Sequence, residues 1–273
     1  MSSISAAADA RRTAGLSGLA PPVLQVEALG VRYGDLVALE QVSWQVAPGE
    51  LLGIIGPNGA GKSSCYDAVT AMVARQGKVT LRGEDVTALP AHHLAARGLK
   101  RAFQQNAFFH ELTVLENMLA VMHETSASGL LACALAPFGA ARRRRSAAQA
   151  AATTLERFGV AAEYHARMPT SIPYGTQRLL SVALAHGAGA HALLLDEPGA
   201  GLGGTDMEQL AVLLHSLKRD GLAVVVIEHH MDLIMAVADR IVVLDQGRCI
   251  AMGTPAHIQR DAAVLEAYLG RSE

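Results

Sequence analysis

Cysteine is scarce in this sequence, and strong charge of either sign is missing. Cys65, Cys133 and Cys249 are odd in number and show no CxxC spacing, which predicts buried thiols in a reducing compartment. The 23 Lys and Arg residues balance 25 Asp and Glu residues, so no overall field attracts the protein to nucleic acid or to an anionic membrane. We therefore expect no nucleic-acid partner, and any contact with lipid would be local.

Long hydrophobic runs are also missing. Apolar residues make up 51% of the chain, yet no stretch reaches the roughly 18 uninterrupted apolar residues that span a bilayer. The first 22 residues are rich in Ala, Ser and Gly, end in Pro21-Pro22 and lack the apolar core of a signal peptide. We expect a soluble or peripheral protein in which residues 1–22 form a disordered tail.

Short apolar runs recur along the chain and indicate an α/β fold. Predicted strands begin at Val23, Leu51, Lys78, Ala192, Leu222 and Arg240. Several of them are apolar at consecutive positions, as in strands covered on both faces by helices. The last run has Gln246-Gly247 at its centre, which predicts a hairpin. Between about 106 and 170 an alanine-rich helical pattern replaces the strands, which predicts a helical insertion.

The segment GPNGAGKSS directly follows the predicted strand LLGII and fits the pattern GxxxxGK[ST]. In such a loop the glycines let backbone N–H groups face phosphate, Lys62 reaches the β and γ oxygens, and the Ser63 hydroxyl can hold Mg²⁺. A chance glycine-rich turn is the alternative, and the preceding strand argues against it. The predicted nucleotide-binding residues are Gly56, Pro57, Asn58, Gly59, Ala60, Gly61, Lys62, Ser63 and Ser64.

Two further strands end in residues suited to nucleotide chemistry. ALLLDEP supplies Asp196 for Mg²⁺ and Glu197 to polarise an attacking water. VVVIEHHM supplies His229, which we favour over His230 for the γ-phosphate contact, because ligands gather at the carboxyl ends of parallel strands. In isolation, carboxylates at a strand end can simply face solvent, and such a histidine is more often structural. The phosphate loop favours the functional interpretation.

In this order the motifs resemble the ATP-binding subunits of ABC transporters from Val23 to Gly270. RGLKRAFQQNAFFHELTVLENM, IEHHMDLIMAVADRIVVLDQG and the terminal GTPAHIQRDAAVLEAYLG look like the branched-chain amino acid importer branch. The resemblance implies an α/β fold of the P-loop NTPase type, the ABC cassette, with an antiparallel β subdomain and a helical insertion. Residues 23–270 would form the ATP-binding domain and residues 271–273 a tail.

The resemblance also assigns roles to individual residues. Tyr33 would stack on adenine, and Gln104 would contact Mg²⁺ and sense the membrane partner. The implied Mg²⁺ ligands are Ser63, Gln104 and Asp196, and the implied catalytic residues are Glu197 and His229.

The implied activity is ATP hydrolysis that powers uptake through a permease. The expected partners are a homologous ATP-binding subunit, either a copy or a relative, two membrane permease subunits and, indirectly, a periplasmic substrate-binding protein. The expected location is the cytoplasmic face of the inner membrane. Cargo differs among relatives, including amides and urea. The alternative class is a soluble ABC ATPase of repair or translation, but such proteins usually fuse two cassettes or contain long coiled coil, and this sequence shows neither.

The stretch Ile172 to Thr176 aligns with the family signature, LSGGQ or LSYGQ, which begins a helix that binds the γ-phosphate held by the opposite subunit. Gly175 is kept, whereas Pro173 and Thr176 replace the serine and the glutamine. Since proline is tolerated at a helix start, we predict an intact helix with lost phosphate donors. Gly203 replaces an expected Asp or Asn. Both departures predict one weakened ATP site, and drift in a single sequence is the alternative.

The helical insertion contains two notable segments. NAFFHELTVLENM groups Phe108, Phe109, Leu112 and Leu115, either as an apolar patch for a partner helix or as the core of the insertion. Residues 130–141 are apolar and precede Arg142 to Arg145. For these we favour packing within the insertion with a solvated arginine face, and an interfacial anchor is the alternative.

Overall fold

The structure of the chain is a computed structural model that describes residues 21–102, 108–125 and 137–269. Its strands are β1 Leu24–Tyr33, β2 Leu36–Val46, β3 Leu51–Ile55, β4 Gln76–Leu81, β5 Glu84–Asp85, β6 Leu99–Ala102, β7 Ala192–Asp196, β8 Ala223–Ile227, β9 Arg240–Asp245 and β10 Arg248–Gly253. Its α-helices are α2 Lys62–Val69, α3 Ala91–Ala96, α4 Val114–Thr125, α6 Pro137–Arg157, α7 Tyr174–Gly187, α8 Gly204–Arg219, α9 Met231–Val237, α10 Pro255–Ile258 and α11 Ala262–Leu269.

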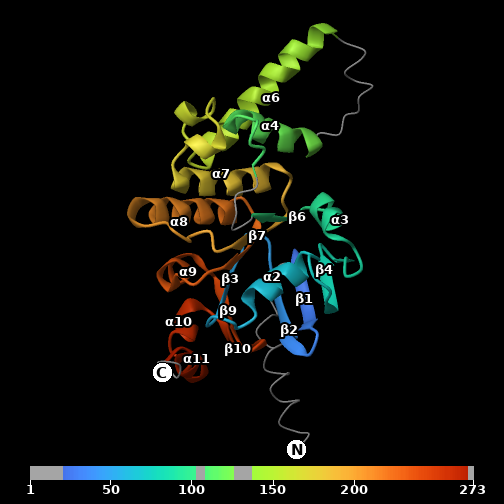
Figure 1. The fold of residues 1–273 in the computed structure, drawn as a ribbon, viewed down its shortest axis with the longest axis vertical. Coiled ribbons are helices and arrows are strands. Elements are labelled where there is room, and N and C mark those ends of the chain that lie inside the picture. Colours follow the sequence, from blue (N-terminus) through green and yellow to red (C-terminus); the bar gives the residue numbers. More distant parts are fainter. Residues whose placement is uncertain (1–20, 103–107, 126–136, 270–273) are drawn as a thin grey trace, which may run out of the picture.

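The strands form two sheets (Figure 1). The first sheet is antiparallel, in the order β2-β1-β4-β5, and the second has the order β10-β9-β3-β8-β7-β6. In the second sheet β9, β3, β8, β7 and β6 run parallel, and β10 returns antiparallel to β9. The hairpin predicted at Gln246-Gly247 is confirmed, and both residues have positive φ angles, as a tight two-residue turn requires.

Two hydrophobic cores lie on opposite faces of the parallel sheet. Leu51 and Ile55 of β3 face one core, while Leu52 and Ile54 face the other. The first core contains residues of α4, α6, α7, α8 and α9, and the second contains residues of α2 and of the antiparallel sheet. Because side chains alternate along a strand, a strand with both faces covered must be apolar at consecutive positions. This explains the continuous apolar runs in β3, β7 and β8.

Strands β2 and β6 were not predicted from the sequence. In β2 the pairing with β1 shifts register more than once, and Gln41 has a positive φ angle. These irregularities interrupt the alternation that marks a half-buried strand. Strand β6 is only four residues long and contains Lys100 and Arg101, so its sequence alone does not mark it as part of a parallel sheet.

Helices α4 and α6 occupy the described part of the region predicted as a helical insertion. Helix α4 begins with a capping box, in which the N–H of Thr113 donates to Oε2 of Glu116 and the N–H of Glu116 donates to the Thr113 hydroxyl. Buried Asn117 donates to the carbonyls of Phe109, Leu112 and Thr113 and accepts the N–H of Phe109. Asn117 therefore fixes the turn that precedes α4.

The described helices include none that is both long enough and apolar enough to cross a membrane. The predicted tail at residues 1–22 falls almost wholly outside the described residues, as do Gln104, Cys133, most of the apolar segment at 130–141 and the tail at 271–273. Arg142, Arg144 and Arg145 on α6 are exposed, as the prediction of a solvated arginine face requires.

Candidate functional site

The phosphate loop connects the end of β3 to the start of α2. A Cβ atom at Gly56 would overlap the carbonyl oxygen of Leu244, and one at Gly61 would lie 2.6 Å from the carbonyl oxygen of Ala38. Glycine at these positions lets the loop pack tightly between the β9–β10 hairpin and β2. The N–H of Gly247 also donates to the carbonyl of Ala60 at 3.1 Å. The loop is therefore held in shape by its neighbours.

Lys62 lies inside this loop. Its Nζ atom donates to the carbonyl oxygens of Gly56 at 2.8 Å and Pro57 at 3.0 Å, and the residue is only 8% exposed. Burial lowers the pKa of Lys62, and the charges of Glu197 and Asp196 oppose this effect. The ammonium group is thus held by carbonyl oxygens of the loop, and it can exchange these contacts for phosphate oxygens.

The remaining residues of the predicted loop differ in exposure. Asn58, Gly59 and Ser63 are exposed, and Ser64 is half-buried. Gly61 precedes α2 in a left-handed conformation, so the first N–H groups of the helix are directed toward the loop, in the arrangement that binds phosphate at helix N-termini.

Asp196 ends strand β7, and Glu197 follows it. Burial, and next the charge of Glu197, raises the pKa of Asp196 to about 6. Glu197 has a φ angle of 45° and donates its N–H to the carbonyl of Ile227 at the end of β8, at 2.8 Å. A positive φ at a non-glycine residue is a strained conformation, held here by the neighbouring strand. The charge of Glu197 thus acts on Asp196, and a divalent cation would relieve this repulsion.

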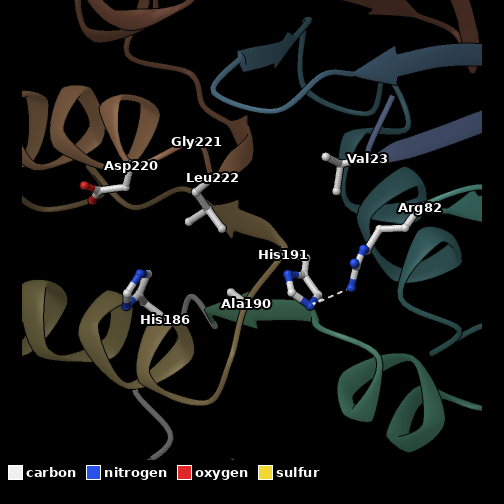
Figure 2. A pocket seen from close by; sticks show the side chains of 8 residues that line it. All are labelled: Val23, Arg82, His186, Ala190, His191, Asp220, Gly221 and Leu222. Carbon is white, nitrogen blue, oxygen red and sulfur yellow. Dashed lines mark hydrogen bonds between the residues drawn. The ribbon is translucent and has the colours of Figure 1, made fainter. Parts of the chain in front are cut away.

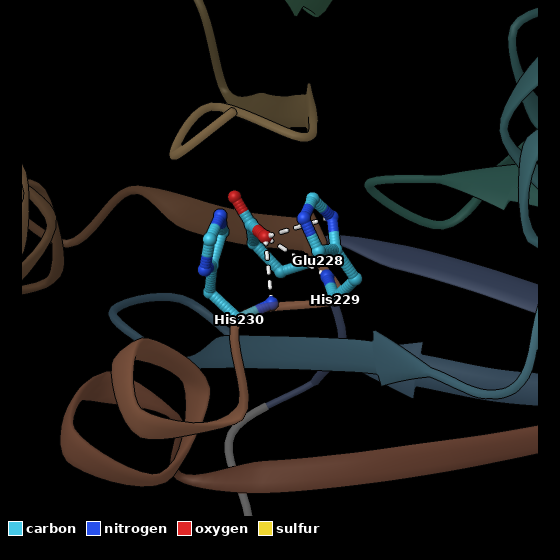
Figure 3. Close-up of side chains that lie close together, drawn as sticks. All are labelled: Glu228, His229 and His230. Atoms are coloured by element: carbon cyan, nitrogen blue, oxygen red, sulfur yellow. Dashed lines mark hydrogen bonds and ion pairs between the residues drawn. The ribbon is translucent and has the colours of Figure 1, made fainter. Parts of the chain in front are cut away.

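His229 follows β8 and lies beside these carboxylates. Its Nδ1 atom is 3.6 Å from Oε1 of Glu197. The same atom is 3.7 Å from Oε2 of Glu228, as Figure 3 shows for that pair. The ring of His230 lies 4.2 Å from that of His229, between centroids. His229 thus lies within ion-pair distance of the Glu197 carboxylate, and its choice over His230 for the γ-phosphate contact stays a prediction.

The structure therefore brings four predicted site residues to the carboxyl edge of the parallel sheet: Lys62, Asp196, Glu197 and His229. Tyr33 ends β1 and is 47% exposed, so its ring is accessible for stacking. Gln104 lies outside the described residues.

Gly175 lies apart from this cluster. It belongs to α7, which packs on the opposite face of the sheet from α2. The predicted helix start is confirmed, since α7 begins at Tyr174 with Pro173 as its N-cap. A Cβ at Gly175 would lie 2.5 Å from Oδ2 of Asp206 on α8. Within one chain, Gly175 at the start of α7 therefore packs against α8.

Glu228 is a site residue that sequence reasoning missed. It is completely buried, and its carboxylate accepts three backbone N–H groups, from Gly199, His229 and His230. The one available signal was an acidic residue at the end of the apolar run VVVIE. The ligand atoms of Glu228, His229 and His230 lie within 4.8 Å of one another. However, the Glu228 carboxylate is already engaged by these N–H groups, so Asp196 with Ser63 is the better site for a cation.

A groove of about 170 Å³ lies between β6, α4 and α7. It is lined by Lys100, Arg101, Ala102, Phe109, Asn117, Val121, Ser181, Leu184, Ala185 and Ala188. The predicted apolar patch is divided: Phe108 is buried in the core and Leu115 packs against it, whereas Phe109 is 58% exposed beside the groove. Phe108 and Leu115 thus belong to the core of the insertion, and a contact of Phe109 with a partner helix stays a prediction.

A second cavity, of about 250 Å³, opens at the amino ends of β7 and β8 (Figure 2). Arg82 donates from Nη1 to Nε2 of His191 at 3.0 Å. Since arginine only donates, Nε2 of His191 must accept. Burial lowers the pKa of both His186 and His191. None of the predicted site residues lines this cavity, which lies at the opposite edge of the sheet from Asp196 and His229.

Comparison with known proteins places these motifs in a family. The family described as "ABC transporter" matches residues 39–200, and that described as "Branched-chain amino acid ATP-binding cassette transporter" matches residues 248–273. The high-affinity branched-chain amino acid transport ATP-binding protein LivG of Escherichia coli K12 is 36% identical over 93% of this chain and 100% of its own. BraF of Pseudomonas aeruginosa, which carries the same description, is 35% identical over 92% and 99%.

More distant relatives have other functions. The lipopolysaccharide export system ATP-binding protein LptB of E. coli K12 is 31% identical over 90% of this chain and 97% of its own.

Among solved structures, an ATP-binding cassette of an ABC transporter in its ADP conformation aligns with a TM-score of 0.77 and 25% identity, over 92% of this chain and 100% of its own. These matches extend over both sheets and the insertion, and the chain therefore belongs to the ABC transporter family of ATP-binding proteins.

Proposed function

We propose that the protein is the ATP-binding and ATP-hydrolysing subunit of an importer for branched-chain or related amino acids. The observation that carries ATP hydrolysis is the approach of His229 to Glu197 at 3.6 Å, next to the carboxylate of Asp196 and the ammonium group of Lys62. The cargo follows from similarity to LivG and BraF, which are named for branched-chain amino acid transport. Import of amides, urea or another small solute is the alternative.

Each side chain has a separate role in this proposal. Tyr33 stacks on the adenine, the loop from Gly56 to Ser64 binds the phosphates, and Lys62 contacts the β and γ oxygens. Ser63, Asp196 and Gln104 would hold Mg²⁺, which neutralises phosphate charge when bound. The close pair formed by Asp196 and Glu197 fits a cation, because the pKa of Asp196 is raised by burial and by its neighbour's charge.

Hydrolysis requires a water molecule in line with the bond that breaks. Glu197 orients this water and accepts its proton, the water oxygen bonds to the γ-phosphorus, and the bond to the bridging oxygen of ADP breaks. His229 donates a hydrogen bond to the γ-phosphate. ADP and inorganic phosphate are the products.

The separation of Gly175 from Lys62 within one chain supports dimerisation. In the proposed assembly the start of α7 meets the ATP held by the phosphate loop of a homologous subunit. Two permease subunits dock at the groove between β6, α4 and α7, so the protein is peripheral, at the cytoplasmic face of the inner membrane. A periplasmic substrate-binding protein would act through the permease.

The first test is Lys62→Ala. We expect this variant to lose ATP binding while its melting temperature stays within a few degrees of the wild type, because the Lys62 ammonium group bonds to carbonyls of its own loop. Arg248→Ala is a matched control, since Arg248 forms an exposed ion pair with Glu40. Isothermal titration with ATP and Mg²⁺ measures the affinity. Wild-type ATP affinity in Lys62→Ala would exclude the assigned phosphate loop.

The second test concerns transport. Purification of the protein in mild detergent is expected to recover hydrophobic permease subunits, and the ATPase of the reconstituted complex is expected to respond to a binding protein loaded with leucine. A protein that purifies without any membrane subunit and hydrolyses ATP alone would support a soluble ABC ATPase.

A further inference from the structure

The Glu228 carboxylate connects the two loops that carry Glu197 and His229. We propose that Glu228 is a positioning residue, which holds His229 and the loop after Glu197 in a fixed relation during hydrolysis. This inference rests on the proposed function, because it presupposes that Glu197 and His229 act on ATP.

The contacts of Glu228 run in two directions, and those with His229 and His230 are drawn in Figure 3. On one side, Oε1 accepts the N–H of Gly199 at 2.6 Å. On the other side, Oε2 accepts the N–H of His229 at 2.8 Å and that of His230 at 3.0 Å. The side chain is completely buried. One carboxylate therefore joins the segment after β7 to the segment after β8.

The loop after Glu197 packs directly on this carboxylate. A Cβ atom at Gly199 would lie 2.7 Å from Oε1 of Glu228 and 3.1 Å from Cε of Met207. The same loop closes on itself, because Ala200 donates its N–H to the carbonyl of Glu197 at 3.0 Å. A displacement of Gly199 would therefore be transmitted to the backbone of Glu197.

The chemistry of this position favours a carboxylate over other side chains. Three N–H groups converge on Glu228, and a carboxylate offers acceptors only. Glutamine has the same shape, but its amide group would turn N–H donors toward at least one of the backbone donors. An apolar residue would leave all three N–H groups without this acceptor, which is costly in a buried site.

The consequence for hydrolysis follows from the position of His229. Its Nδ1 atom lies 3.6 Å from Glu197 and 3.7 Å from Glu228, and its backbone N–H is fixed by Glu228. A misplacement of about 1 Å at a reacting centre can reduce a rate by roughly a hundredfold. Release of these backbone contacts should therefore slow the chemical step while leaving the phosphate loop able to bind ATP.

The test compares Glu228→Gln with Glu50→Gln in the assembled complex. Glu50 is also buried, accepts the N–H of Ala47 at 2.7 Å and pairs with Arg240 at 2.9 Å, but it precedes β3 at the opposite end of that strand from the phosphate loop. We expect Glu228→Gln to lower kcat at least roughly tenfold with the KM for ATP within twofold of the wild type. Glu50→Gln should lower the melting temperature but leave kcat within twofold.

A double-mutant comparison asks whether Glu228 acts through His229. In a His229→Ala background, adding Glu228→Gln should slow single-turnover hydrolysis by a smaller factor than in the wild type, and the remaining effect should come from the loop after Glu197. Hydrogen exchange gives a second readout that does not depend on activity. In Glu228→Gln the amide hydrogens of Gly199, His229 and His230 should exchange faster than in the wild type. In Glu50→Gln their exchange rates should be unchanged.

The proposal is overturned if the two glutamine variants lose the same fraction of kcat, if Glu228→Gln has the same effect with and without His229, or if those amides remain protected. Failure of the proposed function has a different signature, since Lys62→Ala and Glu197→Gln would then leave hydrolysis unchanged. If those two variants lose activity while Glu228→Gln keeps wild-type kcat, only the positioning role is excluded.

Discussion

The Nδ1 atom of His229 lies 3.6 Å from Oε1 of Glu197, although the two residues follow different strands. The parallel pairing of β7 with β8, in which Asp196 lies opposite Ile227, brings the two strand ends together. A backbone hydrogen bond from Glu197 to Ile227 reinforces the same alignment. The pair therefore depends on sheet register.

We expect Glu197→Gln to bind ATP normally and to hydrolyse it at least about 10²-fold more slowly, because the amide cannot accept a proton from the attacking water. Steady-state ATPase of the assembled complex and ATP affinity are the two measurements. Glu208→Gln, at an acidic residue of α8 outside the site, is the control. Turnover near the wild-type value in Glu197→Gln would assign the base to another residue.

The metal-free protein should show a pH dependence that originates at Asp196. Burial and the neighbouring charge of Glu197 raise the pKa of this carboxyl group from 3.8 to about 6. The folded state therefore binds the proton more tightly than the unfolded chain. The stabilising contribution of Asp196 is complete below about pH 4 and is lost as the pH rises through about 6.

Asp196→Asn should remove this dependence. Relative to the wild type, its free energy of unfolding should increase by about 1.4 kcal/mol per pH unit between roughly pH 4 and 6, and the difference should level off above that range. Urea unfolding in the absence of Mg²⁺ and nucleotide measures this difference in the free energy of unfolding between the variant and the wild type. A difference that is independent of pH would contradict the raised pKa of Asp196.

The start of α7 allows a test of the weakened-site prediction. Pro173 is the N-cap, with no side-chain hydrogen bond to the helix, and Gly203 is likewise an N-cap without one on α8. Restoring donors by Pro173→Ser with Thr176→Gln should strengthen ATP-dependent dimer closure by roughly 1.5–3 kcal/mol per recovered charge-assisted bond. This strengthening of dimer closure is expected if the partner is a different subunit that supplies the complete signature.

The measurement is ATPase of the assembled complex after the partner's signature serine has been removed, so that only the site served by this chain's α7 is intact. A clear rise in turnover is expected on restoring the hydroxyl. No change in a folded, assembled complex would show that Pro173 is tolerated and that the signature does not limit this site.

Phe109 should contribute to permease docking. Its ring is 58% exposed beside the groove, while its backbone is fixed by Asn117. Phe109→Asp is expected to reduce recovery of the permease at least about tenfold and to leave ATP affinity unchanged. Val212→Asp is the control, because Val212 is 65% exposed on α8 and does not line the groove. Equal losses in both variants would argue against a docking role for Phe109.

Local sequence was sufficient to identify the phosphate loop and to predict whether most elements are helices or strands. GPNGAGKSS after LLGII identifies the loop because its geometry needs glycine at Gly56 and Gly61, where a side chain would collide with backbone. The apolar runs of β3, β7 and β8 identify buried strands because both faces of that sheet are covered. The prediction that a helix starts after Pro173 was likewise correct, since proline is compatible with a helix N-terminus.

Tertiary structure decided how these elements meet. The order β3-β8-β7 places His229 beside Glu197, and no local pattern encodes which strands become neighbours. The burial of Glu228 was also invisible to sequence reasoning, because a glutamate after an apolar strand normally faces solvent unless donors converge on it. Only packing of the loop after β7 against the end of β8 supplies the N–H of Gly199 as a buried partner for that carboxylate.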